Sequence, residues 1–480
     1  MAEAFNLDEA LTQTPIYEES FKEHLNGNGV AQMQLFHLTD LGNAERFIEQ
    51  CGGIVRWCEL WRKWLVFDGR RWQIDESQKV IILGKNTVRA IYKEAAGIEG
   101  EAIRKQVAKW GMSSEAEGRI HGMLQLAKSE CPMQPDQLDP DPWLLNCANG
   151  TLNLRTGQLR PHARNDFITK LVPIAYDPDA GAPLWEEFLG RIFNGKEDLI
   201  GWLQKALGYT LTGSTAEQIF LLCHGVGSNG KSTFLEIIRA ISGEYGEQAP
   251  FQTFLRQERE GIRNDLAKLR SCRFVAAMES DEGKRLAEAL IKSLTGGDPI
   301  TARFLHAEFF TYMPQFKVWL ATNHRPEIRD SSHAMWRRVR LIPFDVVIPD
   351  AEQDKTLPAQ LKAELPGILA WAVRGCLAWQ QEGLNPPPEA VIVATREYKE
   401  EQDLISAFIT ESCLVRPGLT TPSSDLYLEY AKWCEKNGEK AVNQTIFGNK
   451  LTEKGYRKDR SSVTGKVIRY GLGLKVSHES

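Results

Sequence analysis

Residues 225–233 match the phosphate-binding pattern G-x-x-x-x-G-K-[ST] at every fixed position. They are Gly225, Val226, Gly227, Ser228, Asn229, Gly230, Lys231, Ser232 and Thr233. In such a loop the glycines let backbone N–H groups turn onto phosphates, the lysine reaches the β- and γ-phosphate oxygens, and the next hydroxyl holds Mg²⁺. We therefore expect an exposed loop that binds ATP and Mg²⁺, with Lys231 as a catalytic group and Ser232 as a metal ligand.

The segments that flank this loop fit the pattern. An apolar run at 219–223 precedes it and a helix-like segment at 234–238 follows it. The motif requires this order of strand, loop and helix. The context disfavours the alternative, which is a Gly/Ser turn that matches by chance.

Two further apolar strands are expected downstream, and each ends in a polar residue. Residues 273–278 lead into Glu279, which we assign as the acid that positions Mg²⁺ and the attacking water, at the end of a strand neighbouring the loop's own strand. Asp281 and Glu282 follow closely, and either could instead cap a helix. The second strand, 316–322, ends in Asn323, an ordinary turn residue elsewhere but here a candidate to orient the attacking water.

Composition suggests a multidomain chain without the overall positive charge that would attract nucleic acid. The chain has 480 residues and a net charge of −5, so a basic surface must be local. Nine cysteines lack a CxxC pair, which disfavours zinc and predicts mostly core thiols. The sequence contains neither a signal-peptide pattern nor an apolar run long enough to span a bilayer, so we expect a cytoplasmic protein with no membrane partner.

We expect five segments along the chain. They are a flexible acidic lead-in at 1–35, a mixed α+β domain at 36–180, an ATPase core at 181–350, a helical segment and linker at 351–415, and a terminal domain at 416–480. Asp68-Gly69 and Asn149-Gly150 each lie between apolar runs and predict hairpin turns. The tryptophans between 57 and 72 are expected in the core more often than as a base-stacking platform.

The order of these motifs between 225 and 338 is specific. The phosphate loop, the acid-terminated strand, a Lys/Thr-Gly-Gly-Asp segment at 292–298, the Asn323 strand and the pair Arg337-Arg338 together resemble a superfamily 3 helicase. More narrowly, they resemble the helicase part of phage, plasmid and poxvirus primase–helicases. The resemblance implies an α/β fold: an AAA+-type P-loop core with a parallel sheet, preceded by a mixed α+β domain and followed by a winged-helix domain. It also implies a homohexameric ring that moves on single-stranded and forked DNA.

The same resemblance assigns residues beyond the phosphate loop. Arg337 or Arg338 would be an arginine finger that acts in the neighbouring subunit's site, the alternative being a surface salt-bridge strand. A β-hairpin at 303–316 would enter the central channel with His306 near its tip, Arg303 beside it and Lys292 on the preceding helix. A lone histidine is otherwise a bland surface or core residue.

The terminal unit carries the local basic patch. Residues 450–475 contain eight cationic side chains and only two acidic ones, Glu453 and Asp459. We assign four of these cations to DNA binding: Lys450, Lys454, Arg457 and Lys458. A winged helix would place 445–451 against duplex DNA. A solvated charged face or a protein-docking module is the alternative.

We therefore expect an ATP-dependent replicative DNA helicase of a phage, prophage or plasmid, in the cytoplasm of a bacterial host. The residues before Asp40 leave no room for a primase, so we expect helicase activity without priming and a separate primase or replication protein as a possible partner. The alternative function is an AAA+ switch or loader that remodels proteins without unwinding DNA.

Overall fold

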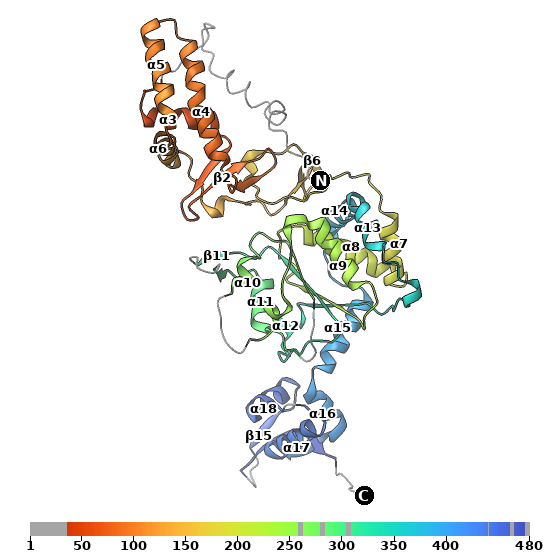
Figure 1. Cartoon of the computed structure of the whole chain (residues 1–480). Coiled ribbons are helices and arrows are strands. Elements are labelled where there is room, and N and C mark those ends of the chain that lie inside the picture. The colour runs from red at the N-terminus through yellow and green to blue at the C-terminus, as the bar shows by residue number, and fades with distance from the viewer. Residues whose placement is uncertain are drawn as a thin grey trace.

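The computed structural model describes residues 36–257, 263–278, 284–303, 309–439, 441–460 and 465–475. Three parts follow one another along the molecule (Figure 1). A helical N-terminal lobe lies at one end, an α/β domain in the middle and a smaller C-terminal unit at the other end. None of the described helices is long and apolar enough to cross a membrane.

The N-terminal lobe joins four helices to a small antiparallel sheet. The helices are α3 (Asp40–Cys51), α4 (Lys79–Ala96), α5 (Glu101–Ser114) and α6 (Glu117–Ala127). The strands β1 (Val55–Cys58), β2 (Lys63–Phe67) and β3 (Trp72–Ile74) pair in that order. The β2–β3 pairing confirms the Asp68-Gly69 hairpin. Trp57 and Trp72 are buried, which confirms that they belong to the core.

A second antiparallel sheet connects this lobe to the middle domain. It consists of β4 (Leu144–Cys147), β5 (Gly150–Asn153) and β6 (Gln158–Arg160), with the predicted turn between β4 and β5. Leu145 and Leu152 belong to the same apolar core as the helices of the middle domain. The connector therefore packs with the middle domain, whereas the sequence placed it in the domain 36–180.

The middle domain is built on a five-stranded parallel sheet. Its strands are β7 (Phe220–His224), β8 (Gly246–Gln248), β9 (Phe274–Met278), β12 (Lys317–Thr322) and β13 (Val339–Pro343), in the order β13-β7-β12-β9-β8. The helices before and between these strands are α7 (Pro183–Ile192), α8 (Glu197–Leu211), α9 (Lys231–Ser242), α10 (Asn264–Ala267), α11 (Glu288–Gly296) and α12 (His333–Trp336). A hairpin of β10 (Ile300–Ala302) and β11 (Phe310–Tyr312) precedes β12.

The segment expected as a separate helical linker, 351–415, belongs to two neighbouring parts. Its helices are α13 (Leu357–Ala363), α14 (Leu365–Glu382), α15 (Glu389–Glu401) and α16 (Leu404–Ser412). Ile368 and Cys376 of α14 lie in the core shared with α8. The middle domain therefore continues through α15, whose Tyr398 ring contacts Trp336 edge-on.

The C-terminal unit begins at α16 and not at residue 416. It continues with β14 (Cys413–Pro422), α17 (Ser423–Lys436), α18 (Gln444–Glu453), β15 (Lys458–Arg460) and β16 (Val467–Leu474). The strands form an antiparallel sheet in the order β14-β16-β15. Phe408 of α16 packs on Tyr430 and Phe447, and this apolar contact fixes the boundary. All nine cysteines of the chain are buried free thiols, as the sequence predicted for most of them.

Candidate nucleotide site

The phosphate loop connects the end of β7 to the first residue of α9. Gly227, Ser228 and Gly230 have φ values of 105°, 48° and 81°, in the left-handed region. A Cβ atom on Gly230 would lie 2.7 Å from the Ile192 side chain, so both the backbone angle and the space require glycine there. The loop thus opens onto α9, whose N-terminal end favours anions.

The segment that follows β13 holds the phosphate loop in place through two hydrogen bonds. Asn229 donates from Nδ2 to the Phe344 carbonyl at 3.1 Å, and the Ile348 amide donates to the Ser228 carbonyl at 2.7 Å. Asn229 is buried, so its role in the structure is to tie the loop to the segment after β13. Ser232 is exposed and Thr233 is half-buried, and both side chains border the cleft described below.

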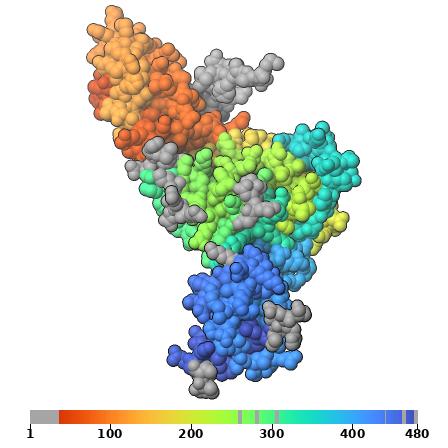
Figure 2. Space-filling model, turned by 60° about the horizontal axis from the view of Figure 1, so that its bottom comes forward, coloured from red at the N-terminus to blue at the C-terminus, as the bar shows by residue number. Residues whose placement is uncertain are grey.

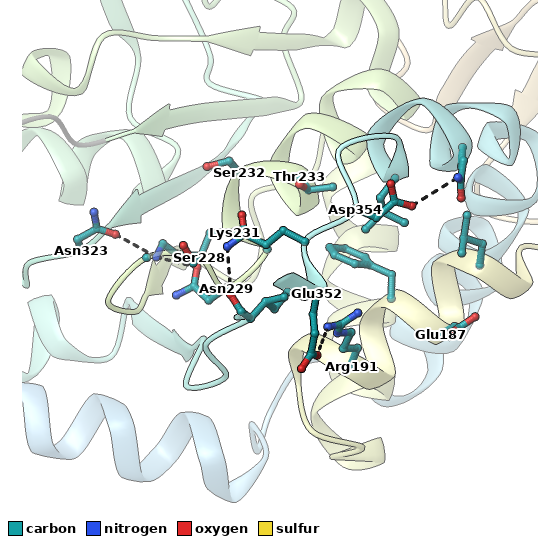
Figure 3. A pocket seen from close by; sticks show the side chains of 18 residues that line it. Glu187, Arg191, Ser228, Asn229, Lys231, Ser232, Thr233, Asn323, Glu352 and Asp354 are labelled. Atoms are coloured by element: carbon teal, nitrogen blue, oxygen red, sulfur yellow. Dashed lines mark hydrogen bonds and ion pairs between the residues drawn. The ribbon is translucent and has the colours of Figure 1, made fainter. Parts of the chain in front are cut away.

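Lys231 is buried, although the sequence predicted an exposed loop. Its side chain is 6% exposed, and Nζ donates to Gly225 O at 2.6 Å, Asn229 Oδ1 at 3.0 Å and Asn323 Oδ1 at 3.1 Å (Figure 3). Burial lowers the pKa of Lys231, and the nearby Cys223 acts in the opposite direction. Two of the three acceptor oxygens belong to the loop, and the third belongs to Asn323, which lies far along the chain. Local sequence therefore could not reveal this burial.

Asn323 lies beside the loop because its strand is the direct neighbour of β7. Thr322 at the end of β12 pairs with His224 at the end of β7. β9 pairs with the far side of β12, so the strand that leads to Glu279 is one place further from the loop than the sequence predicted. Glu279, Asp281 and Glu282 lie outside the described residues.

A cleft of about 500 Å³ extends from the loop between α7 and the segment 348–360. Leu184, Phe188, Ile348 and Leu357 supply apolar walls, and Gln353 and Gln360 supply amide groups. This size suits a nucleotide-sized ligand, and the lining is mostly polar and charged, with these four apolar side chains among it. The loop backbone, Lys231 and the Ser232 hydroxyl form the polar end, which fits a triphosphate with Mg²⁺.

Three ion pairs hold the segment 345–362, which covers this cleft. Arg191 contacts Glu352 at 2.7 Å, Lys362 contacts Glu236 at 2.7 Å, and Lys196 contacts Asp345 at 3.6 Å. Sequence reasoning missed this wall of the site. Its residues carry no motif, and only their position directly after the last strand of the sheet could have suggested them.

The two candidate finger arginines face different surroundings. Arg338 is 8% exposed, and its guanidinium donates to Thr295 Oγ1 at 3.0 Å and to the Ala334 carbonyl. Arg337 is exposed and contacts Gln218. Only Arg337 therefore has a guanidinium at the surface, where another molecule could reach it.

The residues assigned to the DNA channel are only partly described. Lys292 on α11 forms an ion pair with Asp330 at 2.8 Å. Arg303 follows β10 and stacks over Phe309, 4.5 Å from the ring centroid. The β10–β11 pairing confirms a hairpin before the Asn323 strand, with strands at 300–302 and 310–312 and not from 303 onward. His306 lies outside the described residues.

The basic patch of the C-terminal unit is smaller than its sequence suggests. Lys454 contacts Asp403 and Ser406, and so pins α18 to α16. Arg469 is 3% exposed and donates to Thr452, Tyr456 and Gly448. Lys450 lies near the Arg329 carbonyl of the middle domain at 3.4 Å. Arg457 and Lys458 are exposed, and Arg457 makes a 3.4 Å contact with Asp459.

Three family models match successive parts of the chain. Residues 44–194 match a model described as D5 N terminal like, 223–338 match a family of unknown function, and 400–471 match a model described as poxvirus D5 protein-like. The last match begins near the observed start of the C-terminal unit, well before residue 416.

Named relatives come from large DNA viruses. "Putative helicase L207/L206" of Acanthamoeba polyphaga mimivirus is 26% identical over 82% of this chain and 44% of its own length. "Putative helicase 022R" of Frog virus 3 is 28% identical over 48% of this chain and 25% of its own length. "Putative primase C962R" of African swine fever virus is 24% identical over 62% of this chain and 34% of its own length. The chain thus spans less than half the length of these relatives.

A solved structure also resembles the chain as a whole. It is an apo structure of the NrS-1 C terminal region, 12% identical, with a TM-score of 0.49, covering 91% of this chain and all of that one.

Proposed function

We propose that this chain, which belongs to a family of primase–helicase type with D5-like domains, is an ATP-dependent DNA helicase of replication. The observation that carries the proposal is the 3.1 Å contact between Lys231 Nζ and Asn323 Oδ1. It brings the cation that would hold the γ-phosphate next to the amide that would orient the attacking water. Ser232 would hold Mg²⁺ together with Glu279.

The position of Arg337 supports action across a subunit boundary. Val339 pairs with Phe220, the first residue of β7, whereas the phosphate loop follows the last residue of β7. Arg337 therefore lies at the opposite end of the sheet from its own loop. An exposed arginine there suits the site of a neighbouring subunit, as in a closed homohexameric ring.

The proposed contacts with DNA lie on two elements. The β10–β11 hairpin, with Arg303 and His306, would face single-stranded DNA in the channel, with Lys292 behind it. The C-terminal unit, with its three helices and antiparallel sheet, fits a winged helix. There Arg457 and Lys458 remain available for duplex DNA, whereas Lys454 serves the fold.

Several predictions about the biological setting stay open. The relatives come from large DNA viruses, which supports a replication role but not the bacterial host, phage or plasmid expected from the sequence. A helicase without priming, and a separate primase or replication protein as partner, likewise stay predictions.

DNA-stimulated ATP hydrolysis tests this function. Phosphate release is measured with purified chain alone, with single-stranded DNA and with forked DNA, and Lys231→Ala serves as the inactive control. A helicase should be stimulated several-fold by DNA. Hydrolysis that DNA leaves unchanged would contradict the proposal and favour the protein-remodelling switch.

A further inference from the structure

Helix α4 of the N-terminal lobe presents cations on its outer face without a matching acid. The helix contains Lys79, Lys85, Arg89 and Lys93, and its one acid is Glu94. Glu94 turns inward, where it accepts two hydrogen bonds of 2.8 Å from Arg46, a side chain that is 2% exposed. The acid of α4 is therefore used inside the lobe and does not neutralise its outer face.

Lys85, Arg89 and Lys93 form what we call the α4 stripe. They follow one another at intervals of four residues and are all exposed. Such residues lie on one side of a helix, about 6 Å apart along its axis, so the stripe extends over about 12 Å. None of the three side chains makes a hydrogen bond or an ion pair with any residue that the structure describes. Other cations of the lobe do, including Arg119 with Asp40 and Lys105 with Glu101.

Packing fixes the direction in which the stripe points. Val80, Val88 and Ile91 on the opposite side of α4 are buried. A Cβ atom on Gly84 would lie 3.0 Å from Met123, so α6 packs closely there. Asp75 caps the start of the helix by accepting from the Lys79 and Val80 amides at 2.8 and 2.9 Å. The helix cannot rotate the stripe toward the core without losing these contacts.

We propose that the α4 stripe binds the phosphate backbone of DNA and gives the N-terminal lobe a DNA contact of its own. A strand of DNA carries one charge per about 3.4 Å of axis, so about 12 Å faces three or four phosphates. Evenly spaced cations suit such a repeating polyanion. Ile82 and Tyr92 are 45% and 39% exposed on the same helix and offer apolar contact beside the charges.

This contact is separate from those of the proposed helicase function. The N-terminal lobe and the C-terminal unit lie at opposite ends of the molecule (Figure 2). The stripe also lies outside the residues that line the nucleotide cleft. Its loss therefore leaves basal ATP hydrolysis and the C-terminal basic surface in place.

The test is the salt dependence of DNA binding by the full chain. Binding of labelled single-stranded and duplex oligonucleotides is measured by fluorescence anisotropy over a series of salt concentrations. The variant carries Lys85→Gln, Arg89→Gln and Lys93→Gln, all surface changes on a helix. We expect the slope of log K against log salt to become shallower by about 2 on single strands or by about 2.7 on duplex. The strand form on which the slope changes by its full expected amount is the form that the stripe contacts.

Two matched variants define the outcome. Arg104→Gln, Lys105→Gln and Lys109→Gln on α5 make the same change in net charge within the same lobe and should leave the slope as in wild type. Lys85→Arg, Arg89→Lys and Lys93→Arg keep the charges and should also retain it. An unchanged slope in the α4 glutamine variant would overturn the proposal, and so would an equal change in the α5 variant.

Discussion

Replacing Lys231 by alanine tests the nucleotide site through both catalysis and stability. Nζ is the donor to three oxygen atoms, and one of them belongs to Asn323 on the neighbouring strand. With nucleotide bound, the same ammonium would meet the β- and γ-phosphates. Removing one preorganised electrostatic contact of this kind costs about 10²- to 10³-fold in turnover, and we expect at least that loss of ATP hydrolysis.

The same substitution should also lower stability, because the side chain is buried. Hydrogen bonds from a charged donor contribute about 1.5–3 kcal/mol each. Burial of the ammonium, which lowers its pKa, offsets part of this sum. We expect a net loss of about 1–3 kcal/mol in the free energy of unfolding, which corresponds to a fall of a few degrees in Tm.

Phosphate release, nucleotide binding and thermal unfolding are compared for wild type, Lys231→Ala and Lys231→Met. Methionine keeps most of the buried stem without the charge, so it should lose hydrolysis equally but lose less Tm than alanine. Hydrolysis within tenfold of wild type by a folded Lys231→Ala chain would refute the site assignment. An unchanged Tm in that variant would refute the buried position of the side chain.

Four further substitutions separate the proposed roles. Glu279→Gln should bind ATP without turning it over, and loss of nucleotide binding in an equilibrium titration would instead make Glu279 structural. Arg337→Ala should be inactive alone yet regain hydrolysis when mixed with Lys231→Ala subunits, and absence of complementation at any mixing ratio contradicts the in-trans role. Arg338→Ala should mainly lower Tm, since it removes buried hydrogen bonds. His306→Ala should keep basal hydrolysis and lose fork unwinding, and unwinding at the normal rate would exclude a channel contact.

Local patterns predicted much of the fold. The loop 225–233, the turns at Asp68-Gly69 and Asn149-Gly150, and the apolar strands β9 and β12 follow from spacing and residue type alone. These features depend on contacts between close neighbours in the sequence. The predicted core position of Trp57 and Trp72 likewise follows from their place on adjacent short strands.

Long-range packing decided what the sequence could not predict. The insertion of β12 between β7 and β9 is a choice of strand neighbours, which no local pattern encodes. The sequence suggests that Arg338 and Arg469 are surface cations. Both are buried, however, and their guanidinium groups donate hydrogen bonds to Thr295 and to the Gly448 carbonyl. The boundary at α16 depends on Phe408, whose partners come later in the chain.

Unwinding of a forked DNA by purified protein tests the central claim most directly. The strand-displacement assay is run with ATP, with a slowly hydrolysed analogue and with Lys231→Ala, beside measurement of the oligomer's mass in the presence of the analogue. The account predicts displacement with ATP alone, by wild-type protein that assembles into a hexamer. A nucleotide-bound hexamer that hydrolyses ATP but leaves the fork paired would contradict it.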